Sequence, residues 1–170
     1  SEISEFVFGT QYYRPPIPPQ AEWPLDLEQI KAAGFNTIKI WLMWRWHERE
    51  RGCFVWDDVD RLFALCVRLE LKININLMLD AAPDWLYTDY DACRYNHRGE
   101  RVRPIALGAV YIGGVCPCFD NPLVRREAER FIDAAVARYR NHAALIGWDV
   151  WNEPRYLTLS RIGSPGNNDL

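Results

Sequence analysis

The chain has 170 residues, of which 49% are hydrophobic and 25% are charged, a composition typical of a globular protein rather than a disordered one. Its formal net charge of -3 gives no general attraction to nucleic acid or to an anionic membrane surface. Its uncharged runs are far shorter than the roughly 20 residues that a membrane-spanning helix needs.

Apolar extended segments alternate with helical patterns along the chain, which predicts a parallel sheet with helical crossovers. Residues 6–13 form the first predicted strand, and the Pro-rich segment 15–19 ends it. Apolar residues at helical spacing predict a helix over residues 25–33, which Gly34 terminates. A second strand is predicted at residues 37–42.

The middle of the chain repeats this order. A second helix is predicted from Asp57, as its N-cap, to Leu69, and a third strand follows at residues 73–79, where apolar and polar residues alternate. The long segment between Asp80 and Asn121 is rich in Gly and Pro and is of the kind that forms functional loops.

Asn121 and Pro122 together are typical of a helix start, and the third predicted helix runs from there to Arg140. It leads to a fourth strand at residues 144–151. Residues 157–170 carry few apolar side chains and are expected to be an irregular tail.

The most informative motif lies at the end of the fourth predicted strand, where Asn152 and Glu153 stand side by side between Trp151 and Pro154. Barrels of the α/β type assemble their active sites at such strand ends. Glycoside hydrolysis needs one carboxylic acid against an apolar wall to protonate the departing oxygen, and a second carboxylate to attack the sugar. Glu153 suits the first role, and Asn152 suits a hydrogen bond to the sugar 2-hydroxyl. A capped turn with a solvated acid is the alternative for an isolated Asn-Glu pair, and the strand context disfavours it.

Aromatic residues make up 14% of the chain, with eight Trp and eight Tyr, and their rings can stack on the flat faces of sugars. Ordinary core packing is the equal alternative for the Trp residues. The side chains expected to bind substrate lie near the predicted strand ends or, for Trp85, in the long loop, and they are Tyr12, Trp44, Trp46, Asp80, Trp85 and Trp151.

Motifs spread over residues 6–156 carry a family resemblance. They are Asn36-Thr37-Ile38-Lys39-Ile40, then Trp46, Glu48, Gly52, Phe54 and Trp56-Asp57, then Ala81-Ala82-Pro83-Asp84-Trp85-Leu86, then Asn121-Pro122, Arg138-Tyr139, His142, Gly147-Trp148 and Asn152-Glu153. Together they resemble the glycoside hydrolase family 42 β-galactosidases, which are clan A barrels. The resemblance implies an α/β fold of the (β/α)8 TIM-barrel type. It places residues 1–170 in the N-terminal half of the catalytic domain, with about the first four β/α units.

The resemblance also implies a reaction, the hydrolysis of terminal β-galactosides with retention. By resemblance Glu153 is the general acid and base, and Asn152 binds the substrate 2-hydroxyl. The family's nucleophile follows a later strand and is expected to be missing from this chain, so the chain alone is expected to be weakly active or inactive. Lys39 stands where the clan usually carries an Arg. Two alternatives remain open, namely another clan A β-glycanase of the cellulase or mannanase kind, and a non-catalytic half-barrel that binds carbohydrate.

No cofactor and no metal is expected. Cys118 matches one ligand of the zinc-binding family members, but no Cys follows Glu153 to complete four ligands. A different site made of Cys93, His97, Cys116 and Cys118 is a minor alternative. The odd number of five Cys favours a reducing, cytoplasmic location. A carbohydrate is the expected partner, nucleic acid and membrane are not, and a homo-oligomer is left open.

Overall fold

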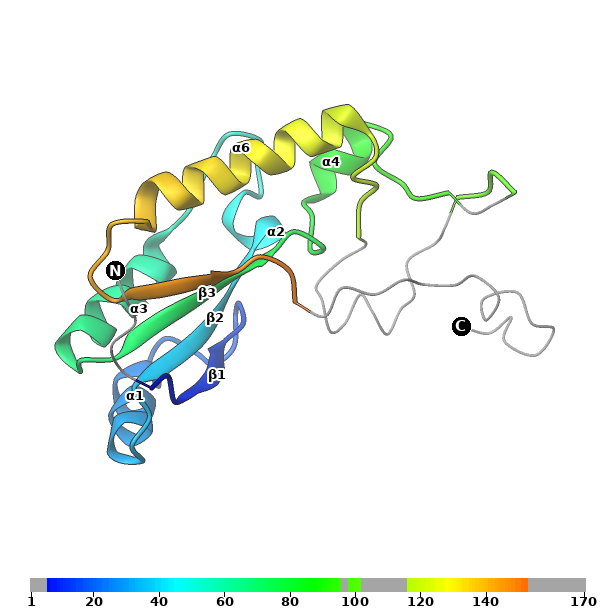
Figure 1. The fold of residues 1–170 in the computed structure, drawn as a ribbon. Helices are drawn as coiled ribbons and strands as arrows, with labels where there is room; N and C mark the ends of the chain where they lie inside the picture. Colours follow the sequence, from blue (N-terminus) through cyan, green and yellow to red (C-terminus); the bar gives the residue numbers. More distant parts are fainter. Residues whose placement is uncertain (1–5, 96–97, 102–115, 153–170) are drawn as a thin grey trace.

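The computed structural model describes residues 6–95, 98–101 and 116–152. Four parallel strands form one sheet in the order β1-β2-β3-β4, and helical segments connect each strand to the next (Figure 1). The strands are β1 (Gly9–Tyr13), β2 (Thr37–Met43), β3 (Lys72–Met78) and β4 (Leu145–Asp149), and the helices are α1 (Trp23–Ala32), α2 (Trp44–His47), α3 (Asp57–Arg68), α4 (Asp84–Asp89) and α6 (Pro122–Tyr139). Parallel neighbours in chain order are the arrangement of a (β/α) barrel, so the predicted partial barrel is confirmed.

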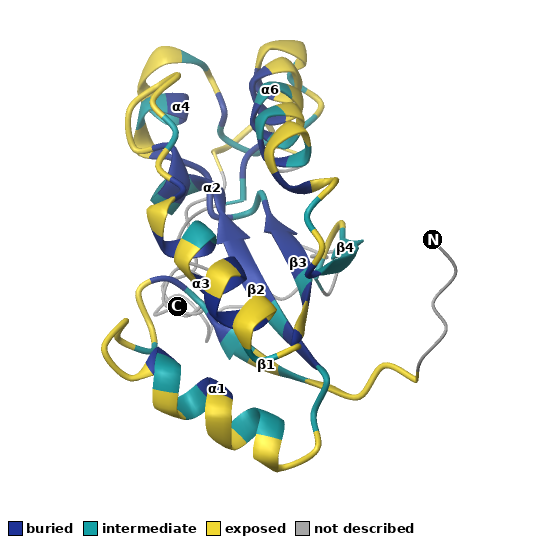
Figure 2. Cartoon of the chain, turned by 90° about the vertical axis from the view of Figure 1, so that its left-hand side faces the viewer, coloured by how far each residue is buried: buried dark blue, intermediate teal, exposed yellow. Residues whose placement is uncertain are grey.

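The two faces of the sheet differ in chemistry. Side chains alternate between the faces of a strand, so one face of the central strands is aliphatic. It is buried against α1, α3 and α6, and its residues are Ile38, Ile40, Leu42, Ile73, Ile75 and Leu77. Figure 2 shows the buried stripes of these helices and the buried central strands. Burying a Leu or Ile side chain contributes about 1.5–3 kcal/mol, so this layer is the main stabilising core.

The opposite face of the sheet corresponds to the barrel interior and is largely polar. The register sets Lys39 of β2 beside Asn74 of β3, and Asn76 of β3 beside Asp149 of β4. A smaller apolar cluster covers its carboxyl end and consists of Trp41, Met43, Met78 and Ala81, with Trp46 packed against it. Charged and amide groups therefore lie just below the strand ends.

The ends of the helices follow local sequence signals. Asn121 caps α6, because its side chain accepts a hydrogen bond from the backbone N–H of Leu123, and Pro122 takes the first turn. Gly34 follows α1 with a φ of 91°, in the left-handed region that favours glycine. Both predictions are confirmed.

The predicted N-cap role of Asp57 is wrong. Helix α3 begins at Asp57 itself, the N-cap position is Trp56, and no side chain caps the helix there. Three acids in the first turn instead complement the positive end of the helix dipole, and they are Asp57, Asp58 and Asp60.

Two short helices were not predicted. Helix α2 follows β2 without an intervening loop, and α4 lies within the long Gly-rich and Pro-rich segment. Among the described residues, none of the helices has the length and apolar character needed to cross a membrane. The predicted tail at residues 157–170 lies outside the described ranges.

Candidate active site

The carboxyl ends of the four strands lie at one edge of the sheet, because all four strands run in the same direction (Figure 1). This edge carries α2 after β2, Asp80 after β3, and Trp151 and Asn152 after β4. Active sites of (β/α) barrels are built at this edge. The candidate site is therefore assembled from segments that are far apart in the sequence.

Trp151 is an anchored but exposed aromatic side chain. Its indole Nε1–H donates to Asp80 Oδ2 at 3.1 Å, which ties the end of β4 to the end of β3. Phe119 packs edge-on against the indole, with ring centroids 6.1 Å apart. The residue still exposes 47% of its surface. A fixed and accessible indole is suited to stacking against a sugar ring.

Asp80 is held from its other side by a cysteine. The Cys116 thiol donates to Asp80 Oδ1 at 2.7 Å, and the guanidinium of Arg94 donates to Cys116 Sγ. Burial and the neighbouring carboxylate both raise the pKa of the Cys116 thiol, so it stays protonated as a donor. Both oxygens of Asp80 thus accept hydrogen bonds from side chains of the protein itself. In this geometry Asp80 holds Trp151 in place.

Lys39 connects the polar interior of the sheet to the candidate site. Its ammonium group forms an ion pair with Asp149 and donates to Asn152 Oδ1 at 3.1 Å. Burial opposes the charged form of Asp149, but the hydrogen bond and charge of Lys39 outweigh it and hold the pKa of this carboxyl below its usual value. The Asp149 carboxyl therefore stays ionised at neutral pH.

Trp46 lies in α2, just beyond the end of β2, and is also anchored. Its indole N–H donates to Asp58 Oδ2 at 2.9 Å, and the Tyr13 hydroxyl donates to the same oxygen at 2.7 Å. The Arg49 guanidinium lies 4.2 Å from the centre of the Trp46 ring. One face of this indole therefore already has a cationic neighbour.

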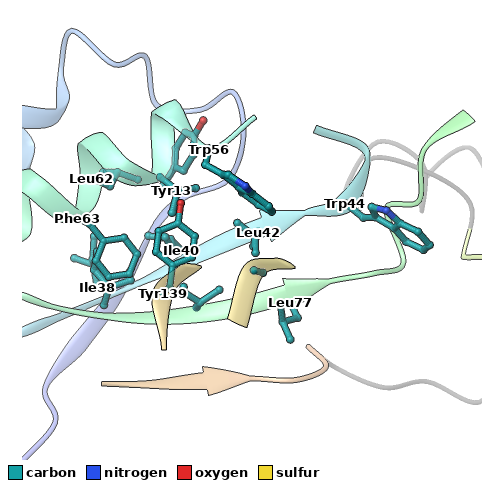
Figure 3. Close-up of a cluster of buried hydrophobic side chains, with 14 of the residues drawn as sticks. Tyr13, Ile38, Ile40, Leu42, Trp44, Trp56, Leu62, Phe63, Leu77 and Tyr139 are labelled. Carbon is teal, nitrogen blue, oxygen red and sulfur yellow. The ribbon is translucent and has the colours of Figure 1, made fainter. Parts of the chain in front are cut away.

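Trp44 lies in the core and not at the site. It has no exposed surface, it stacks on Phe131 at 5.8 Å between ring centroids, and its indole N–H donates to Glu48. Figure 3 shows it at the end of β2 among the buried side chains. The predicted sugar contact of Trp44 is thereby corrected to a core contact. The residue follows the strand directly, and α2 turns its side chain toward the helix layer.

Two other predicted residues have structural partners. The Tyr12 hydroxyl donates to Asp26 of α1 at 2.9 Å, so Tyr12 faces the helix layer rather than the barrel interior. Trp85 in α4 is half-buried, and its indole N–H donates to the backbone oxygen of Glu48 at 3.1 Å. The structure thus brings Trp46, Asp80, Trp151 and Asn152 to the strand ends, and it does not bring Tyr12 there.

The described residues do not fit a metal site. Cys93, Cys116 and Cys118 are half-buried free thiols. Within residues 6–95, 98–101 and 116–152, no three or more His, Cys, Asp or Glu side chains are grouped to hold a metal ion. His97 and Glu153 lie outside these ranges. The zinc site of the zinc-binding family members is therefore not matched by this part of the chain.

The sequence did not predict the side chains that hold the site residues in place. It assigns no role to Asp149 or Asp58, and it places Cys116 only in the minor alternative metal site. Alternation along the strands was a usable signal for two of them. Lys39 and Asp149 fall on the face of the sheet opposite the aliphatic residues. Their pairing across β3 depends on tertiary structure and has no sequence signal.

The fold and the strand-end residues define a class. A parallel (β/α) sheet whose fourth strand leads into Trp-Asn-Glu, with the Trp indole anchored and exposed, is the arrangement of a barrel-type glycoside hydrolase. The family model described as beta-galactosidase, glycoside hydrolase family 42, matches residues 12–161. The chain belongs to glycoside hydrolase family 42.

The names of similar proteins agree with this family assignment. The chain is 28% identical over 151 residues to beta-galactosidase BgaA of Clostridium cellulovorans, covering 85% of this chain and 21% of the relative. It is 26% identical over 132 residues to beta-galactosidase BgaH of Haloferax lucentense, covering 77% of this chain and 19% of the relative. It thus spans about a fifth of the length of these curated relatives.

The fold is shared with a solved structure as well. The cold-adapted beta-galactosidase from Rahnella sp. R3 superposes with a TM-score of 0.76 over 92% of this chain and 22% of its own, at 20% sequence identity. This likeness supports the partial barrel.

Proposed function

We propose that this chain is part of a retaining β-galactosidase in which Glu153 is the general acid and base. The observation that carries the proposal is Asn152, which is held by Lys39 at the end of β4, directly before Glu153 and beside the anchored Trp151. Family membership and the names of the relatives support a β-galactoside as the substrate. Trp151 supplies an aromatic surface for the sugar, and Asn152 hydrogen-bonds its 2-hydroxyl.

The reaction needs two carboxyl groups about 5–5.5 Å apart. In the first step Glu153 gives its proton to the glycosidic oxygen while a second carboxylate attacks the anomeric carbon, so the glycosidic bond breaks and a glycosyl ester forms. In the second step Glu153, now a carboxylate, takes a proton from water, which attacks the same carbon and releases the carboxylate. We place this nucleophile in residues outside the 170-residue sequence, in keeping with the small share of its relatives that the chain spans.

The test compares the complete protein with the 170-residue chain on an aryl β-galactoside. The complete protein is expected to turn over the substrate, and the 170-residue chain is expected to be nearly inactive because it lacks the nucleophile. Glu153→Gln in the complete protein is expected to lower kcat by about 10²- to 10⁴-fold, the usual contribution of a general acid. Glu129→Gln, at an exposed acid of α6, is the matched control and should keep full activity. Full turnover by the Glu153 variant would overturn the assignment.

The substrate class is tested with a panel of aryl β-galactosides, β-glucosides and β-mannosides. A preference for the galactoside is expected. A preference for a glucoside or a mannoside would assign the chain to another kind of clan A activity. Binding of these sugars without any turnover by the complete protein would favour a non-catalytic carbohydrate-binding role.

We also propose a cytoplasmic location. It is supported by five cysteines that are all free, since a reducing compartment keeps thiols unpaired. Fractionation of cells that produce the complete protein tests it, and recovery from the culture medium would contradict it.

A further inference from the structure

Lys39 is a charged residue that reaches the candidate site from the interior of the sheet. It lies on the interior face of β2, and its side chain is 22% exposed. It makes two polar contacts, one with Asp149 of β4 and one with Asn152 just beyond β4. Both contacts reach across β3, which lies between these strands in the sheet.

The length of the lysine side chain makes this reach possible. Neighbouring strands are about 4.8 Å apart, so two strand spacings separate β2 from β4. A short polar side chain on β2 would stop at β3. The flexible stem of a lysine carries its ammonium group across Asn74 and Asn76 of β3 to the end of β4.

The contact with Asn152 fixes the orientation of its amide. An ammonium group only donates hydrogen bonds, so the group facing Lys39 must be the amide oxygen Oδ1. The NH2 group of Asn152 then points away from Lys39 and is left to donate. Asp149 balances the charge of Lys39, so the ammonium group does not leave an unpaired cation beside the site.

We propose that Lys39 is a positioning residue that holds Asn152 with its amide NH2 toward the substrate, which makes Asn152 a hydrogen-bond donor to the sugar 2-oxygen. The inference rests on the proposed function and deepens it. In this arrangement the sugar 2-hydroxyl accepts a bond from Asn152, and its own proton remains free to be donated to another group. A substrate without the 2-hydroxyl loses this contact.

The first test uses the complete protein and compares kcat/KM for an aryl β-galactoside with that for its 2-deoxy analogue. Lys39→Met is expected to lower the preference for the 2-hydroxyl substrate by about tenfold, the effect of one misplaced hydrogen bond. Lys39→Arg keeps a long cationic donor and should retain most of the preference. A merely structural role of Lys39 would lower both rates alike and leave their ratio unchanged, which would overturn the inference.

The matched control is Lys72→Met. Lys72 lies at the amino end of β3, at the opposite edge of the sheet, and donates to the backbone oxygen of Ala143. This variant should leave the preference for the 2-hydroxyl substrate unchanged. Absence of activity in the unmodified complete protein would contradict the proposed function rather than the contact.

The second test needs no turnover. Lys39→Met, Asn152→Leu and the double variant of the complete protein are compared by thermal unfolding. Because one contact joins the two side chains, the double variant is expected to lose less in Tm than the sum of the two single losses. Strictly additive losses would show that Lys39 does not hold Asn152 and would overturn the inference.

Discussion

Glu48 shows how a single buried charge organises the region behind the site. The residue has no exposed surface. One carboxylate oxygen accepts from the indole N–H of Trp44 at 2.8 Å, and the other accepts from the backbone N–H of Gly52 at 2.7 Å and from the Arg130 guanidinium. Taking a carboxylate out of water is costly, and these donors offset the cost. Glu48 therefore joins α2, the following turn and α6.

Replacing Glu48 with Ala is expected to lower the free energy of unfolding of the complete protein by about 3–5 kcal/mol, because it leaves the buried partners without an acceptor. Chemical denaturation measures the loss. Glu28→Ala, at an exposed position of α1, is the control and should change stability by less than about 0.5 kcal/mol. Equal losses in the two variants would contradict the central role of Glu48.

At the scale of the elements, α6 depends on signals at its start. The Asn121 side chain accepts from Leu123 N at 2.9 Å and also donates to the backbone oxygen of Asp91 at 3.0 Å. The cap therefore both starts the helix and ties it to the preceding loop. Along its length α6 buries one face, which includes Phe131 and Tyr139, against the sheet and α3.

Asn121→Ala is expected to destabilise the protein by about 1 kcal/mol, the usual cost of a lost N-cap. Asn121→Ser keeps an oxygen that can accept from the helix and should recover most of this loss. Urea unfolding of the two variants beside the unmodified protein measures both effects. A Ser variant as unstable as the Ala variant would show that the cap oxygen is unimportant and that the contact with Asp91 dominates.

Glu127 of α6 makes stability depend on pH. Burial opposes its charge, but hydrogen bonds from Arg51, Arg130 and Tyr90 outweigh it and hold the pKa of Glu127 below its ordinary value of 4.5. The folded state therefore favours the ionised carboxyl. Its contribution is fully present above the pKa of the unfolded state and is lost as the pH falls through the lower folded-state pKa.

Glu127→Gln is therefore expected to flatten the acid side of the stability profile. Urea midpoints measured from about pH 6 to about pH 3 should fall less steeply for the variant than for the unmodified protein. The variant should also be less stable near neutral pH, where the ionised Glu127 has its three partners. Parallel profiles would show that Glu127 does not cause this pH dependence.

The sequence predicted most elements because their patterns are strong. The alternation in β3 and the Asn-Pro start of α6 are local signals, and the structure follows them closely. The short helices α2 and α4 are stabilised by tertiary contacts, such as the packing of Trp44 against Trp85 at 6.1 Å between ring centroids, and such contacts leave no periodic pattern. The same reason explains why Trp44 was placed at the site.

At the scale of the whole molecule, the site also has a part that the sequence predicts and a part that depends on tertiary contacts. Parallel strands bring their carboxyl ends together, so the location of Trp46, Asp80 and Asn152 could be inferred from the order of the elements. The partners of these residues could not. The contacts of Lys39 with Asn152 and of Asp80 with Cys116 join residues 113 and 36 positions apart in the chain.

Among the described residues, the two outer strands of the sheet, β1 and β4, each have one side without a pairing strand. β1 pairs only with β2, and β4 pairs only with β3. Unpaired backbone groups on an exposed edge can bind another strand. The 170-residue chain produced alone is therefore expected to associate, with a gel-filtration mass above 19.9 kDa.

Ile146→Lys is expected to reduce this association, because a charge on the edge strand β4 disfavours edge pairing. Leu25→Lys, at an exposed position of α1, serves as the control and should not change the elution volume. An unmodified 170-residue chain that elutes at 19.9 kDa would show that its edges are protected.

The consecutive order of the strands has a consequence for biosynthesis. Among the described residues, β2, β3 and β4 each pair with the strand that precedes them in the chain. Each hydrogen-bonded ladder can therefore form as soon as the next β/α unit has left the ribosome, while later units are still being translated. On this route β4, which leads into the candidate catalytic motif, joins a preformed template of three strands.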